Sequence, residues 1–151
     1  MGDSIQGERR TVRGAKANNG SLLLIFAILL VFFGCREGQI DYPPRQVPVG
    51  MLKDARQINA GYQLFMDKCA SCHGKLSEGR SDRADFFKPA APDFTDAHYL
   101  ESDPAYLYWR IEVGKTVEPY RTQGSVMPAW GAHFSEERIW QIVAYLRARA
   151  H

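Results

Sequence analysis

The sequence predicts an all-α domain, and three observations support this fold class. Apolar residues recur at spacings of three and four in three segments, which is the period of a helix packed on a core. No alternating run of β-branched residues is long enough to build a sheet. The segments between the periodic stretches are long and rich in Pro, Gly and Asp. We therefore expect three main helices joined by long loops.

The first predicted helix leads directly into a cysteine motif. Its stripe recurs at spacings of three and four and consists of Ile58, Gly61, Tyr62, Phe65 and Cys69. Such a stripe is expected where one helix face is laid on a core. The helix is predicted to end at CASCH, residues 69–73, so the motif would stand at the end of a packed helix.

The second predicted helix has a start signal and a stop signal. Asp103 suits the N-cap and Pro104 suits the first turn, where a backbone N–H has no helical partner to lose. Gly114 stands just past the expected end. The residues expected on one face are Leu107, Arg110 and Ile111.

The third predicted helix begins after Ser135, which can cap it. Two acidic residues, Glu136 and Glu137, follow in the first turn, where the helix dipole favours negative charge. Two basic residues, Arg147 and Arg149, suit the last turn for the same reason. The apolar stripe consists of Ile139, Ile142, Val143 and Leu146.

The sequence of the N-terminal part of the chain predicts that the protein is exported and attached to a membrane. Residues 22–33, LLLIFAILLVFF, form an apolar run of 12 behind a basic start, shorter than the roughly 20 residues that span a bilayer. The run fits the centre of an export signal, and a tilted, uncleaved anchor is the alternative. Phe33-Gly34-Cys35 resembles a bacterial lipoprotein cleavage site, so we expect removal of residues 1–34 and lipid on Cys35.

The remainder of the chain is predicted to be a tether followed by one domain. Residues 35–52 carry three prolines and no helical period, which indicates an extended tether, and residues 53–151 hold the domain. The formal charge of +2 arises entirely before Cys35, so the rest is neutral and offers nucleic acid no bulk basic field. We expect a lipid-anchored domain on the extracytoplasmic, periplasmic side of a bacterial membrane.

The motif CASCH admits several interpretations. A redox pair of the thioredoxin type would open a helix after a strand, whereas this motif closes a helix. A structural zinc site needs four ligands at paired spacings, and outside the motif only three isolated histidines are available. A plain disulfide between Cys69 and Cys72 would leave His73 and the long loops unexplained.

The spacing C-x-x-C-H is instead typical of covalent haem attachment. Two thiols at this spacing can reach the vinyl-derived carbons along one porphyrin edge, while the adjacent His73 turns a ring nitrogen onto the iron. We therefore predict one haem c, bound through Cys69 and Cys72. With lipid on Cys35, this assignment uses every cysteine of the chain.

Met127 is the candidate for the second axial ligand. It lies in GSVMPAWG, where Pro128 restricts the residue before it and the flanking glycines allow tight turns. A loop methionine between glycine and proline has little value in core packing. The alternative ligands are His98 and His133, and a second histidine would give a lower reduction potential.

Residues 53–151 resemble a class I cytochrome c, which implies three main helices and long loops wrapped around one covalently bound haem. The residues that carry the resemblance are CASCH, Gly61, Phe65, Met127, Tyr145 and Leu146. In this family an aromatic-aliphatic pair of the last helix packs on the glycine of the first. The family also has a proline whose carbonyl receives the second N–H of the ligand histidine; Pro92 in APDF resembles it, with Pro89 as the rival.

Four further residues are candidates for contact with the haem propionates. A partly buried carboxylate requires charged or N–H donors. The candidates are Trp109, Arg110, Tyr120 and Trp130. Packing in the core is the alternative role for the two tryptophans.

Histidine and methionine on the iron leave no position for a substrate, so we expect a carrier of single electrons rather than an enzyme. A tethered shuttle and a fixed subunit of a membrane-bound respiratory or photosynthetic complex both satisfy this expectation. One alternative is a haem enzyme or gas sensor in which Met127 detaches. Another is the electron-accepting subunit of a periplasmic dehydrogenase.

Overall fold

The computed structural model describes residues 40–151. The predicted signal segment 1–34 and Cys35 therefore lie outside the described residues. Residues 41–151 form one compact unit, and no strand occurs in the described part of the chain, which confirms the all-α prediction. Of the helices within residues 40–151, none has both the length and the apolar character of a membrane span.

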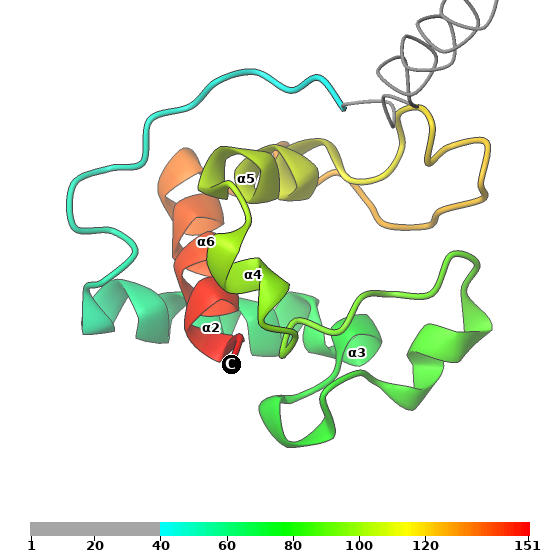
Figure 1. The fold of residues 1–151 in the computed structure, drawn as a ribbon, viewed down its shortest axis with the longest axis horizontal. Coiled ribbons are helices and arrows are strands. Elements are labelled where there is room, and N and C mark those ends of the chain that lie inside the picture. The colour runs from blue at the N-terminus through cyan, green and yellow to red at the C-terminus, as the bar shows by residue number, and fades with distance from the viewer. Residues whose placement is uncertain (1–39) are drawn as a thin grey trace, which may run out of the picture. The chain divides into compact units, whose positions relative to one another are not determined.

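The three predicted helices are all present (Figure 1). They are α2 (Ala55–Lys68), α5 (Pro104–Val113) and α6 (Glu136–Arg149). α2 ends at the cysteine motif as predicted, because Cys69 is its C-cap residue and donates its N–H to the carbonyl of Phe65. The apolar stripes of α5 and α6 are buried in the core.

The helix starts follow the capping signals in the sequence. The side chain of Asp103 accepts a hydrogen bond from the N–H of Ala105, and Ser135 caps α6 in the same way. Asp54 caps α2 by accepting a hydrogen bond from the N–H of Arg56. Each cap satisfies a backbone donor that the first helical turn leaves without a partner.

Four short elements lie between the main helices, where the sequence predicted only loop. They are α3 (Ala70–His73), η1 (Leu76–Glu78), η2 (Asp82–Phe86) and α4 (His98–Glu101). Each has about one turn, which is too short to carry a periodic apolar stripe. Local hydrogen bonds support two of them: the N–H of Lys75 donates to the carboxylate of Glu78 at η1, and Ser81 accepts from the N–H of Arg83 at the start of η2. No side chain caps α3 or α4.

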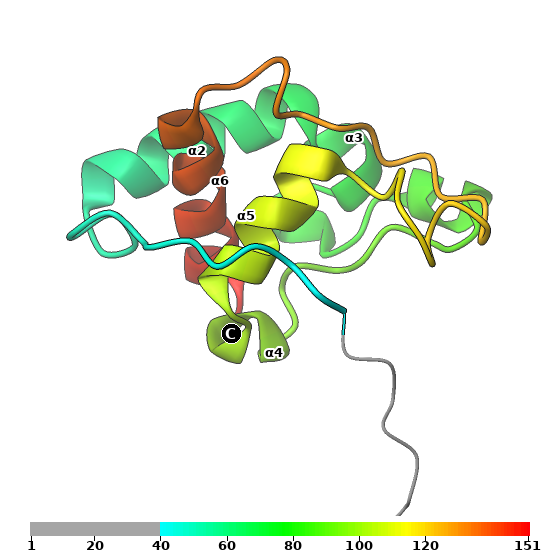
Figure 2. The same ribbon diagram turned by 90° about the horizontal axis from the view of Figure 1, so that it is seen from above.

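The helices α2 and α6 cross at Gly61 (Figures 1 and 2). A Cβ atom at Gly61 would lie 1.9 Å from the carbonyl oxygen of Gln141 and 3.0 Å from the Cβ atom of Tyr145. Only glycine therefore permits this close approach of the two backbones. Tyr145 packs on the glycine, as the resemblance to class I cytochromes c implies.

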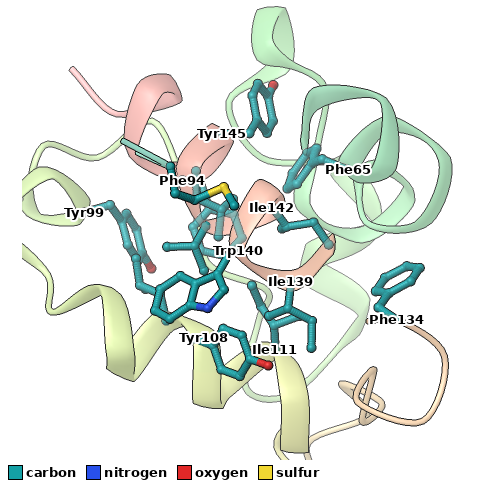
Figure 3. Packing of buried hydrophobic residues seen from close by; sticks show 14 of the residues in the cluster. Phe65, Phe94, Tyr99, Tyr108, Ile111, Phe134, Ile139, Trp140, Ile142 and Tyr145 are labelled. Carbon is teal, nitrogen blue, oxygen red and sulfur yellow. The ribbon is translucent and has the colours of Figure 1, made fainter. Parts of the chain in front are cut away.

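The core beside this crossing is rich in aromatic side chains. Figure 3 shows Phe65 of α2 next to Tyr145 of α6, and their ring centres are 5.1 Å apart. On the other side of α6, Trp140 packs on Tyr108 of α5 with 4.6 Å between ring centres. These contacts join the three helices into one framework, from which the loops extend.

Residues 41–52, here called the strap, belong to this compact unit (Figures 1 and 2, cyan). The hydroxyl of Tyr42 donates to Asp103 at 2.7 Å, and its ring stacks on Trp109. Arg45 forms an ion pair with Glu112 at 2.7 Å. Met51 is only 8% exposed. The segment predicted as a tether is thus packed on the domain from residue 41 onward.

Candidate functional site

The motif CASCH forms the end of α2 and the single turn α3. The N–H groups of Cys72 and His73 both donate to the carbonyl of Cys69, so the three chemically active side chains project from one turn. Gly74 ends this turn with a φ of 76°. A Cβ atom there would lie 2.6 Å from the backbone nitrogen of Ser81, so the following loop folds back closely on the turn.

His73 is held in one orientation and one tautomer. Its Nδ1 atom lies 3.2 Å from the carbonyl oxygen of Pro92. Because a carbonyl oxygen can only accept, Nδ1 carries the proton and Nε2 carries the lone pair. Burial lowers the pKa of His73 to about 4, and the charges of Lys115 and Arg149 act in the same direction. The imidazole is therefore neutral at physiological pH, as a metal ligand must be.

No disulfide joins Cys69 and Cys72 of the motif. Burial raises the pKa of the Cys69 thiol to about 12, and the neighbouring Cys72 and Asp67 act in the same direction. The raised pKa reflects the apolar surroundings of this side chain.

These side chains line one cleft of about 790 Å³, a volume that includes the part open to solvent. Its walls come from α2, α3, α5 and α6, from the segment after α3 and from the segment after α5, drawn in green and in yellow to orange in Figure 1. The walls are mostly apolar, as is usual for a cofactor site. Residues of this apolar wall include Phe65, Phe94, Ile111, Ile142 and Leu146.

Met127 lines the same cleft as Cys69, Cys72 and His73. Its main chain is tied to the end of α5, because the N–H of Lys115 donates to the Met127 carbonyl at 3.1 Å. At Gly114, which has a φ of 64°, a Cβ atom would lie 2.6 Å from this same carbonyl oxygen. Gly114 therefore stops the helix and also makes room for the methionine segment.

Neither of the alternative iron ligands stands in the cleft. His98 is exposed at the start of α4, where its Nδ1 atom lies 2.9 Å from a carboxylate oxygen of Asp96. His133 is also exposed and packs beside Trp130. Of the two candidate prolines, Pro92 provides the carbonyl that His73 contacts, while Pro89 lines the cleft.

Of the four residues predicted to contact the haem propionates, one lines the cleft and three do not. Trp130 lines the cleft and stacks on Phe134, whereas Trp109, Arg110 and Tyr120 are not among the lining residues. These three form a separate cluster: the guanidinium carbon of Arg110 lies 4.3 Å from the ring centre of Trp109 and 4.2 Å from that of Tyr120. Arg110 also donates to the carbonyl of Gly114.

Sequence reasoning missed Lys115 and Phe94. Lys115 lines the cleft and reaches the cluster, with its Nζ atom 4.9 Å from the ring centre of Tyr120. Lys68 and Lys115 are the ionised side chains among the lining residues described, and both are cationic. Phe94 packs on His73 with 4.7 Å between ring centres. Its place two residues after Pro92 was the available signal, whereas nothing in the sequence distinguished Lys115.

The donor set and the wall fit haem c. Two thiols stand on one turn at the spacing of the attachment motif, and the imidazole directs its free lone pair away from Pro92. A thioether sulfur, from Met127, is available in the same cleft. Apolar walls suit a porphyrin, and cationic side chains at the cleft suit its carboxylates.

Known proteins match this part of the chain. A family model described as "Cytochrome C oxidase, cbb3-type, subunit III" matches residues 56–146. The CcoP subunit of the cbb3-type cytochrome c oxidase of Cereibacter sphaeroides is 34% identical over 64% of this chain and 29% of its own length. The CcoP subunit of Rhodobacter capsulatus is 32% identical over 66% of this chain and 31% of its own length. The chain thus spans less than a third of these relatives.

A solved structure has the same fold over much of the chain. It is a chain of the reducing HAO-like protein complex of Kuenenia stuttgartiensis, with a TM-score of 0.53 and 25% identity. The match covers 76% of this chain and 53% of the other. The family model covers most of the helical domain, from α2 to α6. The chain therefore belongs to the family of cytochrome c oxidase, cbb3-type, subunit III.

Proposed function

We propose that residues 41–151 bind one haem c and carry single electrons. In this proposal Cys69 and Cys72 form the thioether bonds, and Nε2 of His73 and the sulfur of Met127 are the axial ligands. The proposal depends on one observation: these four side chains, which come from two distant segments of the chain, line the same apolar cleft. The hydrogen bond from His73 to Pro92 supports the assignment, because metal-binding histidines usually donate their other N–H to such an acceptor.

When bound, haem c supplies a one-electron iron couple, which the axial ligands and the surroundings tune. The chain contributes a rigid frame for both ligands, through Pro92 on one side and through Gly114 and Lys115 on the other. Its apolar walls exclude water from the cleft. With both axial positions filled, no site remains for a substrate, so one electron enters from a reduced partner and leaves to an oxidised one.

We further propose that Lys115 and Trp130, which line the cleft, face the propionate edge of the haem. Arg110, Trp109 and Tyr120 stand behind Lys115 as a supporting cluster. Within residues 40–151, Nε and Nη2 of buried Arg110 have no hydrogen-bond partner. Such a cation is stabilised when negative charge is near, which favours placing the carboxylates on this side.

The membrane and the partner are also part of the proposal. The apolar run 22–33 and Cys35 favour export and a lipid anchor on the extracytoplasmic side of a bacterial membrane. The relatives are named as subunits of cbb3-type cytochrome c oxidases, which supports a membrane-bound respiratory complex as electron acceptor. Because the chain spans less than a third of those relatives, a shuttle and a complex subunit are both compatible with this partner.

The attachment is tested by a denaturing gel stained for haem, in which the full chain is expected to retain its pigment. Loss of the pigment under denaturing conditions would contradict thioether attachment. Mass spectrometry of the purified chain tests the lipid on Cys35. Purification from native membranes, with identification of proteins that co-elute, distinguishes an oxidase partner from a periplasmic dehydrogenase.

Axial ligation is tested by Met127→Ala. We expect the oxidised variant to lose the near-infrared charge-transfer absorption of methionine-ligated haem, and the reduced variant to bind carbon monoxide rapidly. Val126→Ala is the matched control, because Val126 lines the same cleft but has no ligand atom. Full and rapid binding of carbon monoxide to the unmodified protein at neutral pH would instead favour the gas sensor or haem enzyme.

A further inference from the structure

Arg149, the last residue of α6, is a buried cation that contacts the segment behind the ligand histidine. It is 2% exposed. Its guanidinium donates to the carbonyl of Gly74 at 2.7 Å and to that of Lys75 at 3.0 Å. It also donates to the carbonyl oxygens of His73 and Gly79. The sequence suggested only a favourable interaction with the helix dipole at this position.

The charge of Arg149 is not balanced by a direct ion pair. Within residues 40–151 no carboxylate lies within ion-pair distance of its guanidinium, and backbone carbonyl groups make its direct polar contacts. The nearest acidic influence is Asp93, whose pKa the charge of Arg149 helps to lower. Its guanidinium carbon lies 5.0 Å from the ring centre of Phe65. Burying a cation without a counter-charge is costly. A charge kept under these conditions is expected to have a specific role.

The segment that Arg149 contacts is a tight loop, closed within itself by hydrogen bonds between Lys75 and Glu78. Gly74 and Gly79 bound it, with φ values of 76° and 67°, and η1 between them is a single turn. The four carbonyl contacts of Arg149 attach this segment to α6 across 70 to 76 positions of the chain. His73 is thus held at its ring by Pro92 and at its backbone by Arg149.

We propose that Arg149 is a positioning residue for the axial ligand and that its charge raises the reduction potential of the haem. The inference rests on the proposed function, because it requires haem iron on His73. The guanidinium fork fixes the 73–79 segment, and through it the backbone of the ligand. Its positive charge, which no direct ion pair neutralises, lies in a poorly hydrated environment and disfavours the additional positive charge of the oxidised iron.

Arg147 provides a matched control on the same helix. Its guanidinium also donates to backbone carbonyls, including that of Ser102 at 2.6 Å, but these carbonyls belong to α4 and its end. Arg147 therefore has the same chemistry and a similar anchoring role without contact to the ligand segment. A change in the haem that appears on substitution of either arginine would reflect a general loss of stability. A change that appears only on substitution of Arg149 would reflect its contact with the segment of the ligand histidine.

The experiment compares Arg149→Gln, Arg149→Lys and Arg147→Gln in the full-length haem protein. Redox titration of Arg149→Gln is expected to show a lower midpoint potential, by at least the equivalent of a tenfold change in the reduced-to-oxidised ratio, about 59 mV. Arg149→Lys keeps the charge and should retain most of the potential. Arg147→Gln should leave the potential unchanged. An unchanged potential in Arg149→Gln, or an equal shift in Arg147→Gln, would overturn the electrostatic part.

Positioning is measured separately by hydrogen exchange of the peptide that covers residues 74–79. A lysine cannot reproduce the planar fork, so Arg149→Lys is expected to raise the exchange rate of this peptide at least tenfold, and Arg147→Lys is not. Equal exchange rates of this peptide in Arg149→Lys and Arg147→Lys would overturn the positioning role. This comparison does not require Arg149→Gln to fold. Absence of covalent haem in the unmodified protein would instead refute the proposed function, before any variant is compared.

Discussion

The ring of His73 and the carbonyl of Pro92 are joined by a hydrogen bond of 3.2 Å. This contact crosses from α3 to an extended segment that has no regular structure of its own at this point. Phe94, two residues further on, supports the segment, because its ring packs on His73, on Phe65 and on Tyr99. The orientation of the ligand therefore depends on the packing of one aromatic side chain.

Replacing Phe94 with alanine is expected to destabilise the protein. Phe94 is 8% exposed, so its removal leaves a cavity beside the histidine and should lower the free energy of unfolding by about 3–5 kcal/mol. Guanidinium unfolding of the haem protein measures the change. Phe86→Ala is the matched control, because Phe86 is 87% exposed and should change stability by less than about 0.5 kcal/mol. Equal losses in the two variants would refute the role of Phe94.

Gly114→Ala is expected to disturb the methionine ligand without removing the haem. The new Cβ atom would lie 2.5 Å from the carbonyl group of Pro128 and 2.6 Å from that of Met127, so this segment must move. We expect the near-infrared absorption to weaken or disappear. Gly124→Ala is the matched control: its φ is also positive, at 79°, but its Cβ atom would lie 3.5 Å from its nearest contact. The same spectral loss in both variants would contradict this explanation.

Arg45→Ala is expected to loosen the strap. Arg45 makes two hydrogen bonds to the carboxylate of Glu112, and its guanidinium carbon lies 4.4 Å from the ring centre of Tyr108. Loss of these two hydrogen bonds, both from Nη2, and of the cation–π contact should lower stability by about 1–2 kcal/mol. Limited proteolysis should also cleave the strap faster. The exposed Arg56 provides the control, and a strap that resists protease equally in Arg45→Ala and Arg56→Ala would contradict the prediction.

Alkaline pH is expected to destabilise the fold in part through Tyr99. Burial, and then nearby Tyr106 and two carboxylates, raise the pKa of Tyr99 to about 12, whereas that of an unfolded tyrosine is about 10. Between these values the folded chain binds more protons than the unfolded chain, so stability falls as the pH rises from about 10 to about 12. Below pH 10 this group has no effect on the pH dependence.

The variant Tyr99→Phe isolates this effect. Its free energy of unfolding should fall less steeply than that of the unmodified protein over the same pH range, by an integrated difference of about 2 kcal/mol. Unfolding curves in guanidinium at several pH values provide the measurement. The exposed Tyr62, replaced by phenylalanine, serves as the control. Parallel pH profiles for Tyr99→Phe and the unmodified protein would show that another group is responsible.

The sequence by itself determined the three helices and the place of the cysteine motif. Helical period and capping are local properties, so Asp103, Gly114 and Ser135 could mark helix ends without knowledge of the fold. The spacing of CASCH is local as well. The apolar stripe of a helix is also visible in the local sequence, and it predicts burial because a helix with one apolar face has to cover that face. The resemblance then added the pairing of Gly61 with the last helix.

The tertiary structure alone decided which distant groups meet. The resemblance favoured Pro92 but left Pro89 as a rival, and the path of the segment is what brings the carbonyl of Pro92 to His73. The sequence of the strap predicts a free tether, because its contacts with Asp103 and with Glu112 of α5 exist only in the folded structure. Arg149 resembles any basic residue at a helix end. Whether such a charge stays in water or is buried depends on carbonyl groups 70 to 76 positions earlier, which no local pattern contains.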